Sequence, residues 1–215
     1  VPVTIKPGLN PVETTVTVPG PKLWWPVGHG PQNRYRVKAA LWLGGEQLGS
    51  AEACVGFRHV RVNQDPHPLA GRYFTLEVNG RKIFVKGGNV VPADMIYPAI
   101  DRARYDQLTD LALEANFNML RIWGGGLYEK DDFYDLCDAM GLMVWQEFPL
   151  SSSGLDDKPP EDPAVIHELA EIARTYIRRR RHHASLLLWC GGNELSDVFR
   201  HNGQGGKVQL QLYSD

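Results

Sequence analysis

Residues 185–195 read SLLLWCGGNEL, an apolar run that leads into two glycines, an amide and a carboxylate. The run Ser185–Cys190 has the nearly continuous apolar character of a strand that is buried on both faces, as strands of parallel sheets are. The two glycines end this strand, so Asn193 and Glu194 are expected at its carboxyl end, where α/β barrels carry their chemistry. A carboxylate there can give or take a proton, and the adjacent amide can bind a substrate hydroxyl group.

Strand and helix signals alternate upstream of this stretch. Apolar residues recur at helical spacing in three segments, Arg102–Asn116, Glu129–Met140 and Pro163–Arg181. Strand-like runs occupy Ile83–Lys86, Asn118–Trp123 and Leu142–Phe148. Four strands at roughly 30 residues per unit predict a parallel sheet of βα units. Because a complete eight-stranded barrel needs about 250 residues, the sequence predicts at most half of a TIM (β/α)8 barrel.

The first part of the chain has a different pattern, in which short alternating runs are separated by turns rich in proline and glycine. The runs are Thr14–Val18, Tyr35–Leu43, Gly49–Val55 and Arg58–Val62. This pattern is typical of the strands of antiparallel sandwiches. We therefore predict a multidomain chain, with an all-β domain in residues 1–75 and the first four βα units of an α/β barrel in residues 76–215.

Composition excludes several classes of protein. With 215 residues, 43% of them hydrophobic, the chain can bury a sizeable core. A formal net charge of −2 argues against a nucleic-acid partner, which calls for a basic domain or stripe. No run approaches the roughly 18 apolar residues of a membrane span, so no membrane partner is expected. The three cysteines are far apart and odd in number, which fits neither a disulfide framework nor a zinc pattern.

Four short motifs, in this order along the chain, resemble glycoside hydrolase family 2, especially its β-mannosidase-like branch. They are NGRKIFVKGGNVVPAD at Asn79–Asp94, RIWGGGLYE at Arg121–Glu129, VWQEF at Val144–Phe148 and LWCGGNE at Leu188–Glu194. Upstream, LWWP at Leu23–Pro26 and GFR at Gly56–Arg58 resemble the immunoglobulin-like β-sandwich that precedes the catalytic barrel in that family. The resemblance implies a retaining exo-β-glycosidase, most similar to a β-mannosidase, which hydrolyses terminal β-linked sugars of oligosaccharides or glycosides without a cofactor.

The resemblance also implies roles for individual residues. Glu194 would be the general acid/base, and Asn193 would bind the sugar 2-hydroxyl group, a contact that strengthens in the transition state. Asp94 either lies near other sugar hydroxyl groups or caps a turn. The nucleophilic glutamate of the family belongs to the seventh barrel strand, so the remainder of the barrel is expected C-terminal to these residues. We expect residues 1–215 alone to be inactive.

Three further residues carry two interpretations each. Arg121 can position a nearby carboxylate by bidentate hydrogen bonds or form a structural ion pair within the barrel. Trp123, followed by three glycines, can offer an apolar face to a sugar or pack in the core. Glu147 either lines the cleft or satisfies an internal network.

Other features favour structural roles. The run Arg178–Arg181 complements the dipole of a helix end, and the serines of Ser151–Ser153 lack the GxSxG context of a serine hydrolase. His182 and His183 lack an HExxH motif or a carboxylate at ligand spacing, so no metal site is expected. Residues 199–215 match no pattern. Because one carboxylate cannot carry out a double displacement, a non-catalytic carbohydrate-binding or scaffolding fragment is the alternative function.

Overall fold

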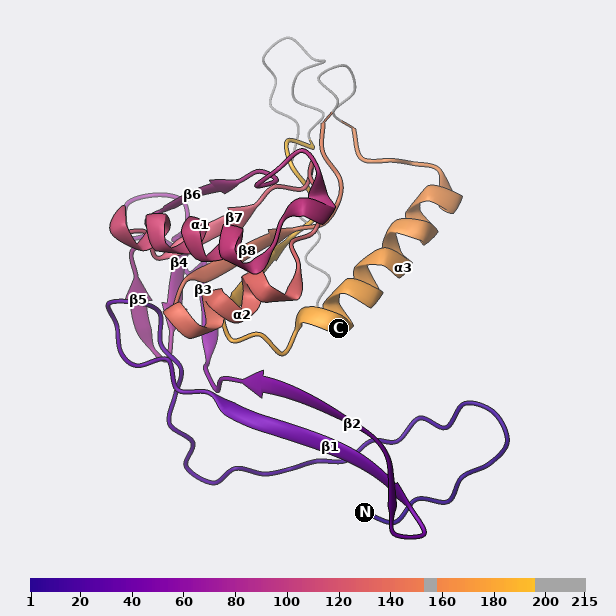
Figure 1. Cartoon of the computed structure of the whole chain (residues 1–215). Helices are drawn as coiled ribbons and strands as arrows, with labels where there is room; N and C mark the ends of the chain where they lie inside the picture. The colour runs from indigo at the N-terminus through magenta and orange to yellow at the C-terminus, as the bar shows by residue number, and fades with distance from the viewer. Residues whose placement is uncertain (153–157, 196–215) are drawn as a thin grey trace.

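The computed structural model describes residues 1–152 and 158–195, which form three separate sheets and their connecting helices (Figure 1). The antiparallel sheets contain β1 (Tyr35–Leu43) with β2 (Glu46–Val55), and β3 (Val60–Asn63) with β4 (Thr75–Val78) and β5 (Arg81–Ile83). The parallel sheet contains, in this order, β6 (Gly87–Val90), β7 (Met119–Ile122), β8 (Met143–Glu147) and β9 (Leu186–Cys190). The helices are the 3-10 turn η1 (Tyr97–Ala99), α1 (Arg102–Glu114), α2 (Asp131–Met140) and α3 (Pro163–Arg180).

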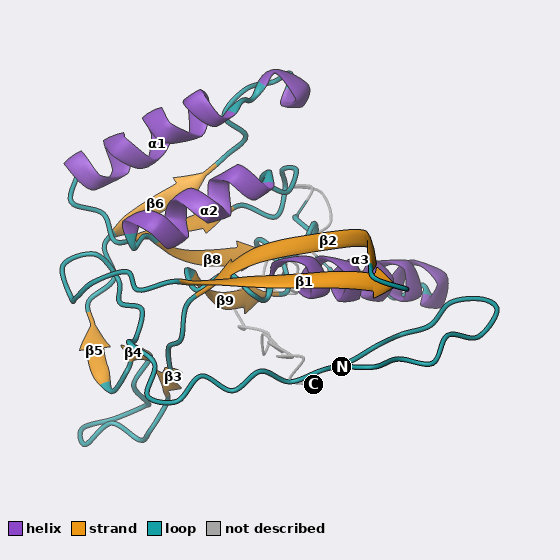
Figure 2. Ribbon diagram, turned by 60° about the horizontal axis from the view of Figure 1, so that its bottom comes forward, coloured by secondary structure: helices purple, strands orange, loops and turns teal. Residues whose placement is uncertain are grey.

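The parallel sheet confirms the predicted succession of βα units. A helix follows each of the strands β6, β7 and β8, and α1 and α2 lie along the same face of the sheet (Figure 2). On that face Leu120, Ile122 and Val144 of the strands pack against Phe133 and Tyr134 of α2. Burial of these apolar side chains, each of which is almost fully inaccessible, is the main force that holds helices and sheet together.

A second core lies on the opposite face of the parallel sheet, at its amino end. Met119 and Met143 are the first residues of β7 and β8, and both pack with Trp24 and with apolar residues of the three-stranded sheet. The Trp24 indole is fully buried and donates a hydrogen bond of 2.8 Å to the carbonyl oxygen of Asp138. The three-stranded sheet therefore closes the amino end of the parallel strands and leaves their carboxyl end for polar residues.

Local signals explain where the helices begin and end. Asp101 caps α1 by accepting a hydrogen bond of 2.9 Å from the Arg104 amide, and Asp162 caps α3 in the same way. Gly141 ends α2 in the left-handed conformation, with φ of 79°. A Cβ atom there would lie 2.6 Å from the backbone nitrogen of Val27, so close approach as well as conformation favours glycine. None of the helices in the described ranges is long and apolar enough to cross a membrane.

The first strand of the barrel differs from the predicted one. Ile83–Lys86 does not form it: β5 ends at Ile83 and pairs antiparallel with β4, and the first parallel strand is β6. The side chain of Asn118 separates the two strands, because it donates to the Phe84 carbonyl oxygen and accepts from the Lys86 amide. Phe84 is 83% exposed, so an apolar sequence alone did not indicate burial here.

The amino-terminal part forms less sheet than the sequence predicts. Residues 1–34, including the expected strand Thr14–Val18, contain only isolated β-bridges. β1 and β2 form a two-stranded ribbon that extends away from the parallel sheet (Figure 1), whereas a sandwich needs two packed sheets. The immunoglobulin-like sandwich therefore stays a prediction, as does the boundary between residues 75 and 76, which falls where β4 begins.

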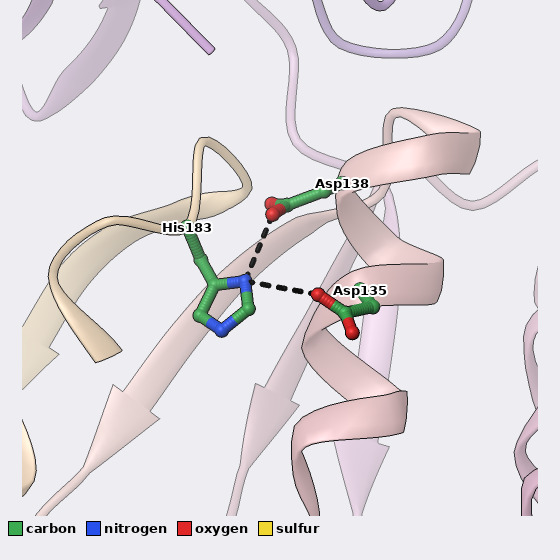
Figure 3. A group of neighbouring side chains, drawn as sticks. All are labelled: Asp135, Asp138 and His183. Carbon is green, nitrogen blue, oxygen red and sulfur yellow. Dashed lines mark hydrogen bonds and ion pairs between the residues drawn. The ribbon is translucent and has the colours of Figure 1, made fainter. Parts of the chain in front are cut away.

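A buried hydrogen-bonded group joins α2 to the loop before β9 (Figure 3). One Asp138 oxygen lies 2.8 Å from Nδ1 of His183, and the other accepts a hydrogen bond of 2.7 Å from the Ser185 amide. Asp135, one turn earlier on α2, lies 3.9 Å from the same His183 nitrogen and is largely exposed. No motif around His183 indicated these carboxylates, since they lie more than 40 positions away along the chain.

We expect Asp138→Ala to lower the free energy of unfolding of a chain that carries the complete barrel by about 3 kcal/mol or more. The substitution leaves two buried donors or acceptors without a partner, and each costs roughly 1–3 kcal/mol. Denaturant unfolding measures the loss. Asp135→Ala is the matched control, for which we expect less than about 1 kcal/mol because that carboxylate is exposed. Equal losses in the two variants would contradict the structural role of Asp138.

Candidate active site

The face of the parallel sheet opposite α1 and α2 is apolar at its amino end and polar at its carboxyl end. On the face opposite α1 and α2, Met119 and Met143 are followed by Arg121 and Trp145, which are in register on β7 and β8. Glu147, the last residue of β8, lies one step further toward the carboxyl end. Every second residue of a strand points to the same face, so Arg121 and Glu147 share the face of Met119 and Met143. The charged side chains lie nearer the carboxyl end than the apolar second core.

Arg121 and Glu147 form a buried ion pair. Nε and Nη2 of Arg121 donate to the same Glu147 oxygen, at 3.0 and 2.5 Å. The Glu147 side chain is 1% exposed and that of Arg121 is 23% exposed. Glu147 is thus the carboxylate partner that both interpretations of Arg121 require, and it belongs to an internal hydrogen-bonded network. Charge-assisted bonds of this geometry offset the cost of removing both ions from water.

Asn193 is held directly by Arg121. Nη2 of Arg121 donates to Asn193 Oδ1 at 2.7 Å, while Nη1 donates to Asn89 Oδ1 at 2.8 Å. Since a guanidinium group has donors only, the oxygen of each amide must face it. The Asn193 amide nitrogen then points away from Arg121 and lies 3.2 Å from Ser151 Oγ. Asn193 is 8% exposed, so its amide orientation is fixed by these contacts.

Glu194 follows Asn193 in a loop that is tied to the loop after β8. The Asn193 amide donates to the Leu150 carbonyl oxygen, and the Ser152 amide donates to that of Asn193, at 2.8 and 2.9 Å. Glu194 adopts φ of 53°, an uncommon backbone conformation for a residue other than glycine. Its side chain is exposed, and Oε2 accepts a hydrogen bond of 3.1 Å from Ser152 Oγ. An exposed carboxylate thus stands just beyond the carboxyl end of β9.

Trp123 lies in the loop that follows β7, directly after the carboxyl end of that strand. Its indole packs directly on the backbone of Gly125, where a Cβ atom would lie 2.0 Å from the ring. The adjacent Gly124 amide donates a hydrogen bond of 2.8 Å to the second oxygen of Glu147. Trp123 is partly exposed and belongs to neither hydrophobic core of the described residues. These features suit an aromatic surface more than a core side chain.

The side chain of Asp94 binds its own loop. Its side chain is exposed and accepts a hydrogen bond of 2.7 Å from the Ile96 amide, as a residue that caps a turn does. Within the described ranges no hydrogen bond joins it to Arg121, Asn193 or Glu194. Its contact with a sugar therefore stays a prediction.

Glu129, at the end of the RIWGGGLYE motif, belongs to the helix side instead. It is 2% exposed, and its Oε2 accepts a hydrogen bond of 2.6 Å from the Tyr105 hydroxyl of α1. Burial raises the pKa of the Glu129 carboxyl group, although the Tyr105 hydrogen bond opposes that shift. Two buried glutamates, Glu129 and Glu147, thus have different surroundings, and only Glu147 contacts the site.

Sequence reasoning missed three polar residues of this site, namely Asn89, Ser151 and Ser152. All three contact a predicted site residue through their side chains. The serines carried no motif of their own, and the only signal for Asn89 is its register opposite Arg121 in the parallel sheet. That register becomes visible only once the first barrel strand is placed at β6.

Comparison with known families decides to which family these residues belong. The model of the TIM barrel domain of glycosyl hydrolases family 2 matches residues 72–207, which is more than half of the chain. A second family 2 model matches residues 2–58. The chain belongs to glycosyl hydrolase family 2. The four parallel strands accordingly belong to the TIM barrel domain of the family, and the resemblance inferred from the four motifs is confirmed.

Individual relatives of this family 2 chain are named β-mannosidases. It is 36% identical to β-mannosidase B of Thermothelomyces thermophilus, over 85% of this chain and 21% of that one, and 37% identical to the rat β-mannosidase. The crystal structure of the Dictyoglomus thermophilum β-D-mannosidase superimposes with a TM-score of 0.76 at 40% identity, covering 83% of this chain and 21% of that one. The chain therefore spans about a fifth of the length of these relatives.

We expect Trp123→Ala, in a family 2 chain that carries the complete barrel, to weaken binding of a monosaccharide inhibitor by about 1–3 kcal/mol, the value of a buried apolar side chain. Calorimetric titration measures the affinity, and a melting curve measures stability.

Trp24→Ala is the matched control for this measurement. Because Trp24 is fully buried in the second core, its loss should cost about 3–5 kcal/mol of stability and leave inhibitor affinity unchanged in the folded protein. If Trp123→Ala behaved like the control, with normal affinity and a collapsed melting temperature, Trp123 would be a packing residue.

Proposed function

We propose that this chain is part of a retaining exo-β-glycosidase of the β-mannosidase type, in which Glu194 is the general acid/base. One observation carries the proposal: Asn193 and Glu194 follow β9 at the carboxyl end of the parallel sheet, and Arg121 holds Asn193 there at 2.7 Å. Catalytic groups of barrel enzymes occupy that end of the strands. The substrate would be an oligosaccharide or glycoside with a terminal β-linked sugar.

The proposed chemistry assigns Glu194 two steps. In the first, its protonated carboxyl group gives a proton to the leaving glycosidic oxygen while a second glutamate attacks the anomeric carbon. In the second, the Glu194 carboxylate removes a proton from water, which hydrolyses the glycosyl–enzyme intermediate. Family resemblance places the nucleophile on the seventh strand of the barrel, roughly 5–5.5 Å from the acid.

Asn193 supports this assignment through its orientation. Because Arg121 takes the amide oxygen and Ser151 Oγ accepts one N–H, one N–H donor of Asn193 remains for a ligand. A donor in that place can bind the sugar 2-hydroxyl oxygen, and such a bond strengthens as the transition state gains oxocarbenium character. Trp123 would cover the apolar face of the same sugar, which favours one terminal sugar and hence exo cleavage.

The choice of a β-mannosidase rests on the relatives. Proteins named β-mannosidase are 35–38% identical to this chain over most of its length. Solved structures of other activities, such as the Amycolatopsis orientalis exo-chitosanase, share 22% identity and thus only the fold.

The proposal extends to the domain arrangement. We assign residues 1–75 to an immunoglobulin-like sandwich and residues 76–215 to the first four βα units of the barrel. Exposed apolar side chains of the β1–β2 ribbon support the sandwich, since Leu41 and Trp42 are 51% and 59% exposed where a second sheet would cover them. The family model that matches residues 2–58 supports it as well.

We expect Glu194→Gln, in the protein with the complete barrel, to lower turnover by about 10²–10⁴-fold on an aryl β-mannoside with a poor leaving group. The amide cannot supply the proton, and general acid–base catalysis typically contributes that factor. An activated aryl group, which leaves without protonation, should lose much less in the first step. Steady-state kinetics with the two substrates measures the difference.

Glu168→Gln, on the exposed surface of α3, makes the same chemical change and should leave turnover intact. Unchanged turnover of Glu194→Gln on the poor leaving group would refute the assignment. Absence of any glycoside hydrolysis in the unmodified protein, together with measurable sugar binding, would favour the non-catalytic carbohydrate-binding alternative.

A further inference from the structure

We propose that Glu147 is a positioning residue for the glycosidase reaction, which sets both the orientation of the Asn193 amide and the place of the Trp123 loop. The inference rests on the proposed function, since it assigns Asn193 to the sugar 2-hydroxyl group. It goes beyond that function because Glu147 itself faces neither the sugar nor the scissile bond in the proposed arrangement.

The first Glu147 oxygen acts through Arg121. That oxygen receives two hydrogen bonds, from Nε and Nη2, which fix both the position and the plane of the guanidinium group. Nη2 is the same nitrogen that donates to Asn193 Oδ1 at 2.7 Å. Rotation of the guanidinium group about the Cδ–Nε bond would break this contact. Only the contact with Ser151 Oγ would then orient the Asn193 amide, and because a hydroxyl group can donate as well as accept, the amide could turn its oxygen toward the sugar.

The second Glu147 oxygen acts on the loop after β7. It accepts a hydrogen bond of 2.8 Å from the Gly124 amide, one residue after Trp123. A single carboxylate therefore links the end of β8 to two parts of the site that come from β9 and from the β7 loop. One oxygen accepts from Arg121 and the other from Gly124, so neither oxygen can replace the other.

The environment of Glu147 prevents replacement of these bonds by water. The side chain is 1% exposed, so a lost hydrogen bond leaves an unpaired donor on Arg121 or Gly124. Gln146, the preceding residue, is equally buried but faces the other side of the sheet, where it bonds to Tyr134. Of these two adjacent residues, only Glu147 hydrogen-bonds to Arg121.

Glu147→Gln tests the inference because the amide keeps the size of the side chain but replaces one acceptor oxygen by a donor. It can satisfy either Arg121 or Gly124, but not both. We expect the preference for a β-mannoside over its 2-deoxy analogue, measured as the ratio of kcat/KM values, to fall by about 10-fold or more. A loss of this size is typical when the geometry of a binding group is relaxed.

The experiment uses the protein with the complete barrel and the 4-nitrophenyl β-mannoside with its 2-deoxy counterpart as substrates. Asn193→Ala should reduce the 2-hydroxyl preference on its own. In the Asn193→Ala background, Glu147→Gln should cause little further loss of that preference, because both changes remove the same interaction. A role in stability alone would lower activity on both substrates equally and leave the ratio unchanged.

Glu129→Gln is the matched control, since Glu129 is also a glutamate with almost no exposed surface and contacts α1 instead of Arg121. We expect it to leave the ratio unchanged. Glu147→Asp provides a second variant in case the amide fails to fold. It keeps the charge, but its side chain is one methylene group shorter and cannot reach both partners.

The outcomes separate the two levels of the proposal. If the unmodified protein hydrolyses neither substrate, the proposed function fails and the inference fails with it. If the unmodified protein prefers the 2-hydroxyl substrate and Asn193→Ala removes that preference, the function stands. A ratio for Glu147→Gln equal to that of the control would then overturn the inference, as would failure of both Glu147 variants to fold, which would assign Glu147 to stability alone.

Discussion

The buried contact between Arg121 and Glu147 sets the organisation of the site, because two charges inside a parallel sheet require all their hydrogen bonds to be satisfied. Arg121, on β7, donates hydrogen bonds to Glu147, Asn193 and Asn89. These three residues lie at the end of β8, just after β9 and near the end of β6. The remaining Glu147 oxygen binds the Gly124 amide. The requirement to compensate one buried ion pair thus brings together the carboxyl ends of all four parallel strands.

The rest of the fold separates this polar end from the apolar one. Met119, Met143 and Trp24 fill the amino end, where the three-stranded sheet covers the parallel strands. Asp138 and His183 hold α2 against the segment that enters β9 at the same end. The amino end therefore supplies stability, while residues at the carboxyl end can be exposed or adopt an uncommon backbone conformation, as Glu194 does.

Departures from the predicted fold have local causes. The apolar run Ile83–Lys86 has the composition of a buried strand, yet the Asn118 side chain binds its backbone and breaks it, while the strand that forms, β6, begins with two glycines. Composition cannot anticipate a side chain that arrives from 32 positions further along the chain. The amino-terminal strands were predicted from alternation alone, and alternation does not say which partner a strand will find.

By itself, the sequence determined the succession of parallel strands and helices, the helix boundaries at Arg102, Met140 and Pro163, and the place of Asn193 and Glu194 after β9, because these follow from short-range patterns. Only the tertiary structure decided the partners: Glu147 for Arg121, Ser152 for Glu194 and Asp138 for His183. Each of these pairs joins residues from different helices, strands or loops. Their distances depend on how the strands are in register, which no single stretch of sequence contains.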